Sequence, residues 1–531
     1  MGTGGMGGSG GMSAGGMGGV GGMNVGGMGG SGGGIVCDPG VGKACYSGAP
    51  GTENIGPCKG GATLCQPDGM GYGPCLGEVV PIVEECSTTA VDDDCNAAVN
   101  DHCGLWITRG TGTNDQAILG IATDSDGNVI VTGHIAGTLD FGAGVMNGFG
   151  GLDIFVSKFD KAGNHLWSKV YGSPTDDEGL GIAVDALGNS YVAGYFTGMM
   201  TVDAMNLPSS DLQDAVVIKI DTTGQVVELR PLGGLGNQRA NAIAVDDVGG
   251  VIVTGTFDNQ FNTALGVVTS VNALDGFVIK LSSTLTEQWQ KTFGDSGDDE
   301  GVSVKTDSAN RIYLTGYFDE IVDFGGGAIG DGGSYDVFLA KLDSSGNHLL
   351  SKGFPVLGDQ FGDAIGVDAM GNIYIVGDFS TSIDMGGGLV NSVGKFDAYV
   401  TKFDSNGGHL YTKIYGDPVD QFMRAMAIDK SGDVVFTVGH DGVVDYGGGP
   451  ITNVGAAGSN DIVVVKLKGS TGDHVWSRRF GNASDQDVRC LAVDSMKNIY
   501  VAGDFNSSIN VGVGSISSVS GRDAFLFALP P

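Results

Sequence analysis

Acidic side chains recur along this chain at a fixed spacing, and they are the first candidates for chemistry. The phrase Ala183-Val-Asp-Ala-Leu-Gly-Asn189 returns in seven related copies, in five steps of 61 residues and a last step of 65. Seven carboxylates at one register position suggest an Asp-rich site. We expect them instead to shape a turn between two strands, because Asp accepts hydrogen bonds from nearby backbone N–H groups. The residues concerned are Asp124, Asp185, Asp246, Asp307, Asp368, Asp429 and Asp494.

Two further polar series follow the same register. One is Asp115, Asp176, Asn237, Asp298, Asp359, Asp420 and Asp485, and the other is Asp153, Asp214, Asp275, Asp336, Asp397, Asp461 and Asp523. A sevenfold set of carboxylates could line a channel and gather Ca²⁺ or a cationic ligand. Recurrence in every copy favours backbone capping instead, since a ligand site usually breaks the symmetry of a repeat.

A separate group of oxygen ligands precedes the repeats. It comprises Asp92, Asp93, Asp94, Asn96, Asn100 and Asp101. Ca²⁺ takes six to eight such oxygens, so this segment is a candidate calcium site, and Ca²⁺ is the only cofactor that the chain suggests. A solvated acidic loop explains the same residues equally well.

Eight of the nine cysteines are concentrated around that segment. They are Cys37, Cys45, Cys58, Cys65, Cys75, Cys86, Cys95 and Cys103. The even count and the absence of a Cys-x2-Cys pair favour four disulfides over a zinc site, although the connectivity cannot be deduced. Disulfides place this module outside the cytosol. The ninth, Cys490, replaces a core-strand residue and is predicted to be a buried, inert thiol.

Evidence for catalysis is weak in the sequence. Paired acids such as Asp176-Asp177 suggest glycosidase chemistry, but adjacent residues of a strand point to opposite faces and would not flank one bond. No His-Glu-x-x-His, Gly-x-Ser-x-Gly or phosphate-loop motif occurs. Four histidines share one turn position, which predicts exposed turn residues: His165, His348, His409 and His474.

The elements that must position these residues follow from alternating apolar patterns. The second copy predicts strands at 153–159, 166–171, 180–184 and 190–195. A Gly-rich connection of about 20 residues, such as 196–212, follows the last of these strands and precedes the next Asp-led strand. Four short strands in each of seven units predict an all-β chain with a seven-bladed β-propeller of four-stranded antiparallel blades. The first copy lacks its Asp-led strand and the last lacks its Trp strand, so residues 105–109 should pair with 523–529 and close the ring.

Composition divides the chain into three parts. Residues 1–34 are Gly/Met-rich and uncharged, which predicts a disordered linker, residues 35–103 form the disulfide module, and residues 104–531 form the propeller. The net charge of −34 excludes nucleic acid as a partner. No apolar run could form a transmembrane helix, and no signal peptide is visible. We expect a signal peptide or a lipid-anchored Cys upstream of the first residue.

Residues 104–531 resemble the beta-propeller repeat (SBBP) family of bacterial secreted and surface proteins, through Asp323-Phe-Gly-Gly-Gly327, Tyr335-Asp-Val-Phe-Leu-Ala-Lys-Leu-Asp343 and the recurring Asp-x-x-Gly-Asn turn. Residues 37–103 resemble the Cys-rich leader of large bacterial surface proteins. The Asp92–Asn96 segment is similar to the metal-binding motif Asp-Asn-Asp-Cys-Asp-Gly of those proteins, but Asn96-Ala97 stands where Asp-Gly is expected. The resemblance implies propeller architecture and an extracellular or cell-surface location, and no catalytic residues.

These observations predict a non-enzymatic binding or adhesion protein, with calcium as a possible stabiliser and an unknown protein or polysaccharide as its partner. The variable Gly-rich connections are the expected contact regions, because loops of a rigid scaffold carry function. The alternative is a carbohydrate-active hydrolase or lyase on the same fold. An asymmetric cluster of acids and His at one central mouth would favour that alternative, and the sequence shows none.

Overall fold

The computed structural model describes residues 39–47, 53–54, 59–67, 72, 74–79, 105–271, 273–330, 332–454, 458–482, 484–512 and 515–531. Every regular element in these residues is a β-strand. They belong to two compact units, a small one containing residues 39–47 and 59–79 and a large one containing residues 105–531. The all-β prediction is confirmed for the part of the chain described.

The small unit is a disulfide-bonded hairpin. Strands β1 (Gly42–Cys45) and β2 (Gly61–Leu64) pair antiparallel, and a disulfide joins Cys45 to Cys75 with a Cα–Cα distance of 5.8 Å. Cys65 is also disulfide-bonded. The remaining predicted disulfide cysteines (Cys37, Cys58, Cys86, Cys95 and Cys103) and the candidate calcium ligands (Asp92, Asp93, Asp94, Asn96, Asn100 and Asp101) lie outside the described residues.

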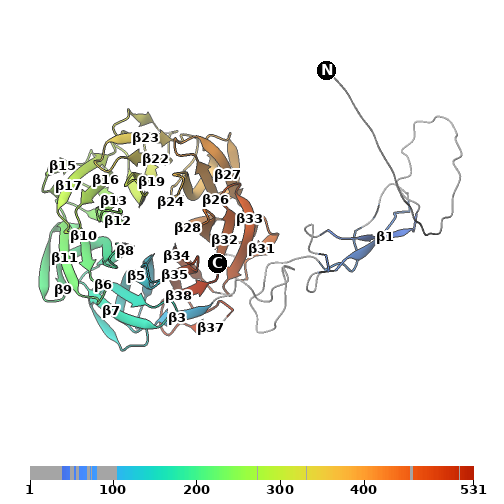
Figure 1. Ribbon diagram of the computed structural model, residues 1–531, viewed down its shortest axis with the longest axis horizontal. Helices are drawn as coiled ribbons and strands as arrows, with labels where there is room; N and C mark the ends of the chain where they lie inside the picture. Colours follow the sequence, from blue (N-terminus) through green and yellow to red (C-terminus); the bar gives the residue numbers. More distant parts are fainter. Residues whose placement is uncertain are drawn as a thin grey trace, which may run out of the picture. The chain divides into compact units, whose positions relative to one another are not determined.

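The large unit consists of seven four-stranded antiparallel sheets arranged as the blades of a propeller, as Figure 1 shows. Each blade is named here by a Roman numeral, and its strands are given from the inside of the ring outward. Blade I contains β4 (Gln116–Thr123), β5 (Val129–Leu139), β6 (Met146–Phe159) and β7 (His165–Tyr171). Blade II contains β8 (Glu178–Val184), β9 (Ser190–Val202), β10 (Met205–Ile220) and β11 (Val226–Leu232). Blade III contains β12 (Gln238–Val245), β13 (Val251–Phe257), β16 (Asp275–Leu281) and β17 (Glu287–Phe293).

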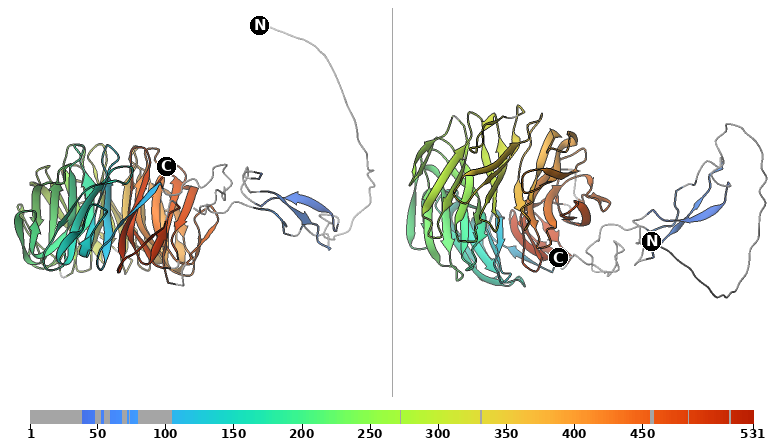
Figure 2. Two further views of the ribbon diagram at one scale, coloured as in Figure 1. Left: turned by 90° about the horizontal axis from the view of Figure 1, so that it is seen from below. Right: turned by 45° about the horizontal axis from the view of Figure 1, so that its top comes forward.

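The remaining blades continue around the ring, which is seen from its edge on the left of Figure 2. Blade IV contains β18 (Glu300–Thr306), β19 (Ile312–Phe318), β22 (Asp336–Leu342) and β23 (His348–Gly353). Blade V contains β24 (Ala364–Val367), β25 (Ile373–Ile383), β26 (Val390–Phe403) and β27 (His409–Tyr415). Blade VI contains β28 (Gln421–Ile428), β29 (Val434–His440), β32 (Asp461–Lys468) and β33 (Asp473–Phe480). Blade VII contains β34 (Gln486–Val493), β35 (Ile499–Phe505), β38 (Asp523–Leu529) and β3 (Trp106–Gly110).

Blade VII confirms the predicted closure of the ring. Strand β3 is the outermost strand of this sheet and pairs with β38 from Trp106 opposite Ala528 to Gly110 opposite Ala524. The two ends of the propeller chain therefore share one sheet, which is visible where β3 and β38 meet in Figure 1. Strand β3 thus covers the edge of β38, which would otherwise be left open at the junction.

The core of the propeller lies between neighbouring blades. Ile154 and Val156 of blade I pack against Val192 and Val216 of blade II in one such cluster. Central strands are buried on both faces, which explains their near-continuous apolar runs, and all seven residues of β13 are buried. Tryptophans of the outermost strands add contacts between blades, since Trp167 Nε1 donates to the carbonyl of Thr222 at 3.2 Å.

The Gly-rich connections are β-hairpins rather than irregular loops, which corrects the prediction. In blades I, II and V the second and third strands extend into the hairpin, and the other four blades form separate two-stranded sheets. These sheets are β14 (Gln260–Thr263) with β15 (Gly266–Thr269), β20 (Ile321–Val322) with β21 (Ile329–Gly330), β30 (Val443–Asp445) with β31 (Pro450–Thr452), and β36 (Ser508–Asn510) with β37 (Ser515–Ser517). Apolar residues at their tips, such as Phe324, are buried against the blades.

Candidate functional site

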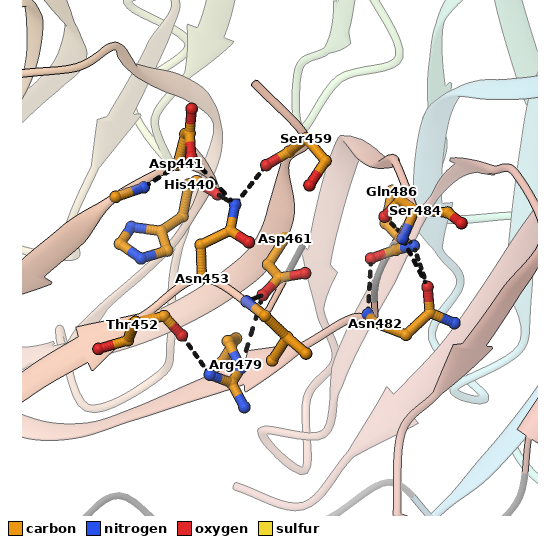
Figure 3. Close-up of polar contacts among 12 residues, drawn as sticks. His440, Asp441, Thr452, Asn453, Ser459, Asp461, Arg479, Asn482, Ser484 and Gln486 are labelled. Carbon is orange, nitrogen blue, oxygen red and sulfur yellow. Dashed lines mark hydrogen bonds and ion pairs between the residues drawn. The ribbon is translucent and has the colours of Figure 1, made fainter. Parts of the chain in front are cut away.

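The innermost strands β4, β8, β12, β18, β24, β28 and β34 contact their neighbours around the ring. Residues of all seven strands line a central channel. We call the end of the channel where these strands begin the mouth. A buried Gln or Asp precedes the mouth in every blade and fixes the turn that enters the inner strand. Gln486 is an example, because its Nε2 donates to Asn482 Oδ1 at 3.0 Å (Figure 3).

The seven Asp residues of the repeated phrase lie away from the mouth, at the far ends of the inner strands. Asp124 Oδ1 accepts the N–H groups of Asp126 and Asn128 at 3.0 and 2.9 Å, so the predicted turn-shaping role is confirmed. Its Oδ2 accepts from Asn128 Nδ2 and lies 2.9 Å from the ammonium of Lys158. Buried pairs of this kind recur in Lys280–Asp246 and Lys466–Asp429. The sequence reasoning missed these lysine partners.

The two other acidic series also cap backbone groups, as predicted. Asp176 Oδ1 accepts the N–H of Leu152 at 2.9 Å, and Asp461 Oδ2 accepts the N–H of Val454 at 2.8 Å beside Arg479 (Figure 3). Burial raises the pKa of Asp461 to about 6. Each Asp of these two series is tied to its own blade or to the turn after it, so neither series forms a ligand-binding ring.

The four turn histidines are half-buried, so the prediction of exposed residues is wrong. His348 Nε2 lies 3.0 Å from Ser351 Oγ, and the imidazole packs against Gly326 of the hairpin in its own blade. His409 and His474 make the same contact with Gly387 and Gly448. Burial lowers the pKa of His165, His409 and His474. These residues hold hairpins in place.

The mouth is where the blades differ from one another. The first residue after each buried Gln or Asp varies, and so does the third. At the first position stand Ala117, Glu178, Arg239, Glu300, Phe361, Phe422 and Asp487. At the third stand Leu119, Leu180, Asn241, Val302, Asp363, Arg424 and Arg489. An asymmetric cluster of acids, arginines and aromatic residues results, which corrects the expectation that no such cluster exists.

Glu178 and Arg239 form one side of the mouth. Tyr195 donates its hydroxyl to Glu178 Oε1 at 2.8 Å, and His134 Nδ1 lies 3.5 Å from Glu178 Oε2. The Arg239 guanidinium lies 4.7 Å from the centre of the Tyr195 ring. Burial alone would raise the pKa of Glu178, but the neighbouring His134, the hydrogen bond from Tyr195 and the charge of Arg239 together lower it. Glu178 is therefore held as a carboxylate.

Glu300 occupies the equivalent position in blade IV with a different outcome. Tyr317 donates its hydroxyl to Glu300 Oε2, and Asn241 Nδ2 donates to Oε1 at 2.8 Å. Burial raises the pKa of Glu300 in spite of these hydrogen bonds. The pKa of one Glu in the mouth is thus lowered, and the pKa of the other is raised.

Asp363, which directly precedes β24, and Asp378 of β25 form a carboxyl pair in blade V. Burial raises the pKa of both groups, and the charge of Asp378 raises that of Asp363 further. Arg424 opposes the shift, but its Nε has no hydrogen-bond partner among the described residues. Two carboxyls in such a site share a proton rather than ionise together.

Blade VII carries an ion-pair network instead. Arg489 Nε donates to Asp504 Oδ1 at 3.0 Å, and Arg522 Nη2 donates to Asp487 Oδ2 at 3.1 Å. Arg424 Nη2 lies 3.7 Å from Asp487 Oδ1 and links this network to blade VI. Arginine is suited to such sites because its planar guanidinium offers several donors at once.

A row of aromatic side chains completes the mouth over blades IV to VI. Neighbouring ring centres are 5.1 to 6.2 Å apart, and all five side chains are half-buried. Part of each ring is therefore free for a ligand while the rest is fixed by its neighbours. The row is Tyr317, Tyr335, Phe361, Phe396 and Phe422.

Cys490 and the Asp176-Asp177 pair do not form a functional site. Cys490 is buried, and burial raises the pKa of its thiol, in agreement with the prediction of an inert residue. Of the predicted acid pair, Asp177 is buried and Asp176 is exposed, so the two do not face one site. Within the described ranges, no three His, Cys, Asp or Glu side chains are arranged to hold a metal ion, and no helix could span a membrane.

No protein-family model matches this chain. A protein of Acanthamoeba polyphaga mimivirus, described as an uncharacterized WD repeat-containing protein, is 23% identical over 449 residues, which cover 65% of this chain and 31% of that protein. The match thus spans about a third of the relative. The solved structures with a similar fold include the Dos1 propeller, with a TM-score of 0.40 and 10% identity over 81% of this chain and 96% of that one.

Two further solved structures have the same general likeness. A quinohemoprotein alcohol dehydrogenase from Comamonas testosteroni gives a TM-score of 0.40 with 10% identity over 80% of this chain and 76% of its own. YCF48 bound to D1 peptide gives 0.37 with 8% identity over 80% of this chain and 94% of its own. These proteins are similar to this chain in fold alone.

Proposed function

We propose that this protein is a non-enzymatic binding protein, secreted or attached to the cell surface, and that its mouth receives an extended polypeptide segment of a partner. One observation carries the proposal: the mouth departs from the sevenfold repetition that the turn Asp residues keep in every blade. A scaffold needs the same residue in each blade, whereas a ligand that lies across the channel contacts each blade differently.

The composition of the mouth favours a polypeptide over a polysaccharide. Protein-binding surfaces are enriched in Tyr, Phe and Arg, and their hot spots especially in Tyr and Arg. Arg239 and Arg424 each bury an Nε atom that has no hydrogen-bond partner among the described residues. A carboxylate of the partner would pair with the half-buried guanidinium groups of these two arginines, and the apolar side chains of the partner would rest on the aromatic row. Carboxylates between the arginines disfavour a partner of uniform negative charge.

The proposed location rests on the small unit. Disulfides such as Cys45–Cys75 form and persist outside the reducing cytosol. A hairpin of two four-residue strands has little core of its own, and the disulfides supply the stability that burial cannot. An extracellular or cell-surface location is consistent with both observations.

The test is a selection of displayed random peptides against the full chain, followed by affinity measurements on the selected peptides. Arg424→Gln should weaken binding at least tenfold, because a charged hydrogen bond to the ligand is lost. Lys161→Gln removes a cation from an exposed turn outside the mouth and should change nothing. Selected peptides that bind Arg424→Gln as well as the parent would contradict the proposal, and an EDTA arm reports any part played by Ca²⁺.

A second candidate, a carbohydrate-active hydrolase or lyase, is favoured by the Asp363–Asp378 pair. Burial raises the pKa of Asp378 to about 7, a value suited to a general acid, and the pKa of Glu178 in the same mouth is lowered, as suits a carboxylate. A panel of acidic and neutral polysaccharides incubated with the parent and with Asp363→Asn distinguishes the candidates. Turnover that disappears in Asp363→Asn would establish the enzyme, and glycan binding without turnover would overturn the polypeptide ligand.

A further inference from the structure

The aromatic row ends over blades IV and V in three rings that contact one another, and we call this group the aromatic corner: Tyr317, Tyr335 and Phe361. The ring centre of Tyr317 lies 5.1 Å from each of the other two, which are 5.8 Å apart. Tyr317 stands at 71° to Tyr335 and at 89° to Phe361. All three side chains are half-buried, so their mutual packing fixes the rings while part of each stays accessible.

Carboxylates lie beside the aromatic corner. Asp298 Oδ2 accepts a hydrogen bond from the Tyr335 hydroxyl at 3.4 Å, and Asp359 accepts one from the hydroxyl of Ser334, the preceding residue. Burial raises the pKa of Tyr335, and the charges of Asp298, Asp319 and Asp359 raise it further. The electrostatic potential at the corner is therefore negative.

Other aromatic rings of the propeller have a cation supplied by the protein itself. In the mouth, the Arg239 guanidinium lies 4.7 Å from the ring centre of Tyr195, and that of Arg424 lies 5.3 Å from the ring centre of Phe422. Lysines lie 4.7 to 6.0 Å from four further ring centres: Tyr191, Tyr313, Tyr374 and Tyr411. Among the described residues, no Lys or Arg lies over a ring of the aromatic corner. The corner thus combines ring faces and carboxylates, the two components of a cation-binding site, and leaves the cation to a ligand.

We propose that the aromatic corner binds an arginine side chain of the partner polypeptide. The inference rests on the function proposed for the mouth and names what this end of the mouth recognises. A guanidinium is planar, so it can stack on an accessible ring and donate to a carboxylate such as Asp298 at the same time. An ammonium is more strongly hydrated and lacks the planar fork, so a lysine gains less from the same site.

Two other occupants fit the corner less well. A divalent cation needs several oxygen ligands around one point, and no three His, Cys, Asp or Glu side chains are so arranged in the part of the chain that the structure describes. A neutral sugar would stack on the rings but would gain nothing from the negative charge beside them. The net charge of −34 adds a long-range attraction for a basic segment.

The rest of the aromatic row indicates what accompanies the arginine in the partner. From Phe361 the row continues to Phe396 and then to Phe422 in steps of 6.2 and 5.8 Å, and Arg424 lies over the last ring. An extended chain rises about 3.3 Å per residue, so the two ends of this stretch are about four residues apart. We expect the partner segment to have an arginine, then apolar residues, and an acidic residue about four positions from the arginine.

Matched peptides that bind the full chain test the inference. Peptides selected for the mouth should contain an arginine, and its replacement by citrulline, which keeps the shape but not the charge, should weaken binding at least tenfold. Tyr335→Leu should remove most of that difference, whereas Tyr335→Phe keeps the ring and should preserve it. Asp298→Asn should weaken the arginine peptide at least threefold, although its Oδ1 can still accept the N–H of Leu274. Asp176→Asn makes the same change at the equivalent position of blade II and should leave binding unchanged.

A second probe separates this inference from the proposal for the mouth. Saturation-transfer NMR of the full chain with acetylarginine methylamide requires no polypeptide. Its signal should exceed that of the citrulline analogue in the parent and should fall to the level of that analogue in Tyr335→Leu. Failure to select any peptide, with this signal intact, would contradict the function proposed for the mouth alone.

Three results would overturn the inference itself. They are equal affinities for the arginine and citrulline peptides, a lysine peptide that binds as tightly as the arginine peptide, and a neutral oligosaccharide that binds the parent but not Tyr335→Leu. Thermal melting of each variant ensures that a lost signal reflects the corner rather than misfolding.

Discussion

Blades V and VII carry an Asp at the same place, and their surroundings turn it into two different groups. Asp378 and Asp504 each follow the Gly of the second strand, and both are buried. The inner-strand residue beside Asp378 is Asp363, whereas Arg489 takes that position beside Asp504. One residue of the inner strand therefore decides whether its neighbour becomes a protonatable acid or half of an ion pair.

The two blades also differ in how the chain builds them. Blade V is formed by four consecutive strands, β24 to β27, whereas blade VII combines β34, β35 and β38 with β3 from the other end of the propeller. Residues far apart in sequence meet there, as when Asp115 accepts the N–H of Arg522 at 2.9 Å. The blade that closes the ring is thus also the one with the most extensive ion pairing at the mouth.

The largest effect is expected from removing the closing strand. Deletion of residues 524–531 removes Phe525, Leu526, Phe527 and Leu529, all fully buried. At about 1.5–3 kcal/mol for each buried side chain, the loss is about 6–12 kcal/mol, which is comparable to the whole stability of a typical domain. Calorimetry should show that the cooperative transition of the propeller is lost or moved far down in temperature. Deletion of residues 530–531 is the control, and a 524–531 deletion that melts like the parent would contradict the role of closure.

A smaller effect should separate the two acidic environments. Arg489→Ala leaves the buried Asp504 with Arg522 as its remaining partner and should cost about 1–3 kcal/mol in urea unfolding. Asp363→Asn at the equivalent position of blade V removes a repulsion and should be neutral or stabilising at neutral pH. Arg489→Lys should restore part of the loss, because it keeps the charge but not the fork of donors. Equal costs for Arg489→Ala and Asp363→Asn would show that the two blades do not differ in this way.

Recurrence in the sequence predicted the ring well and the mouth poorly. Seven copies with a displaced start suffice to predict seven blades and the pairing of β3 with β38. The mouth was missed because a repeat pattern identifies what the copies share, and residues such as Arg239 and Asp363 are those that differ. The sequence does show these residues as positions that vary from copy to copy, one and three places after a position that is always Gln or Asp. The exposure of His348 was mispredicted because the hairpin that covers it lies more than 20 residues earlier in the chain.

The smallest effect concerns how stability depends on pH. Burial raises the pKa of Asp378 to about 7, so between about pH 4 and 7 the folded state keeps a proton that the unfolded chain releases. The stability from this group is complete below that window and is lost as the pH rises through about 7.

Asp378→Asn carries no such penalty, and its gain in stability over the parent should grow by on the order of 2 kcal/mol from pH 5 to pH 7.5 in urea unfolding. Asp504→Asn makes the same change within the ion-pair network and should destabilise the protein at both pH values, since it leaves Arg489 and Arg522 without a carboxylate between them. A gain for Asp378→Asn that is the same at pH 5 and pH 7.5 would mean that the carboxyl pair in blade V is ionised throughout, and that the contrast between the two blades is one of geometry rather than of charge.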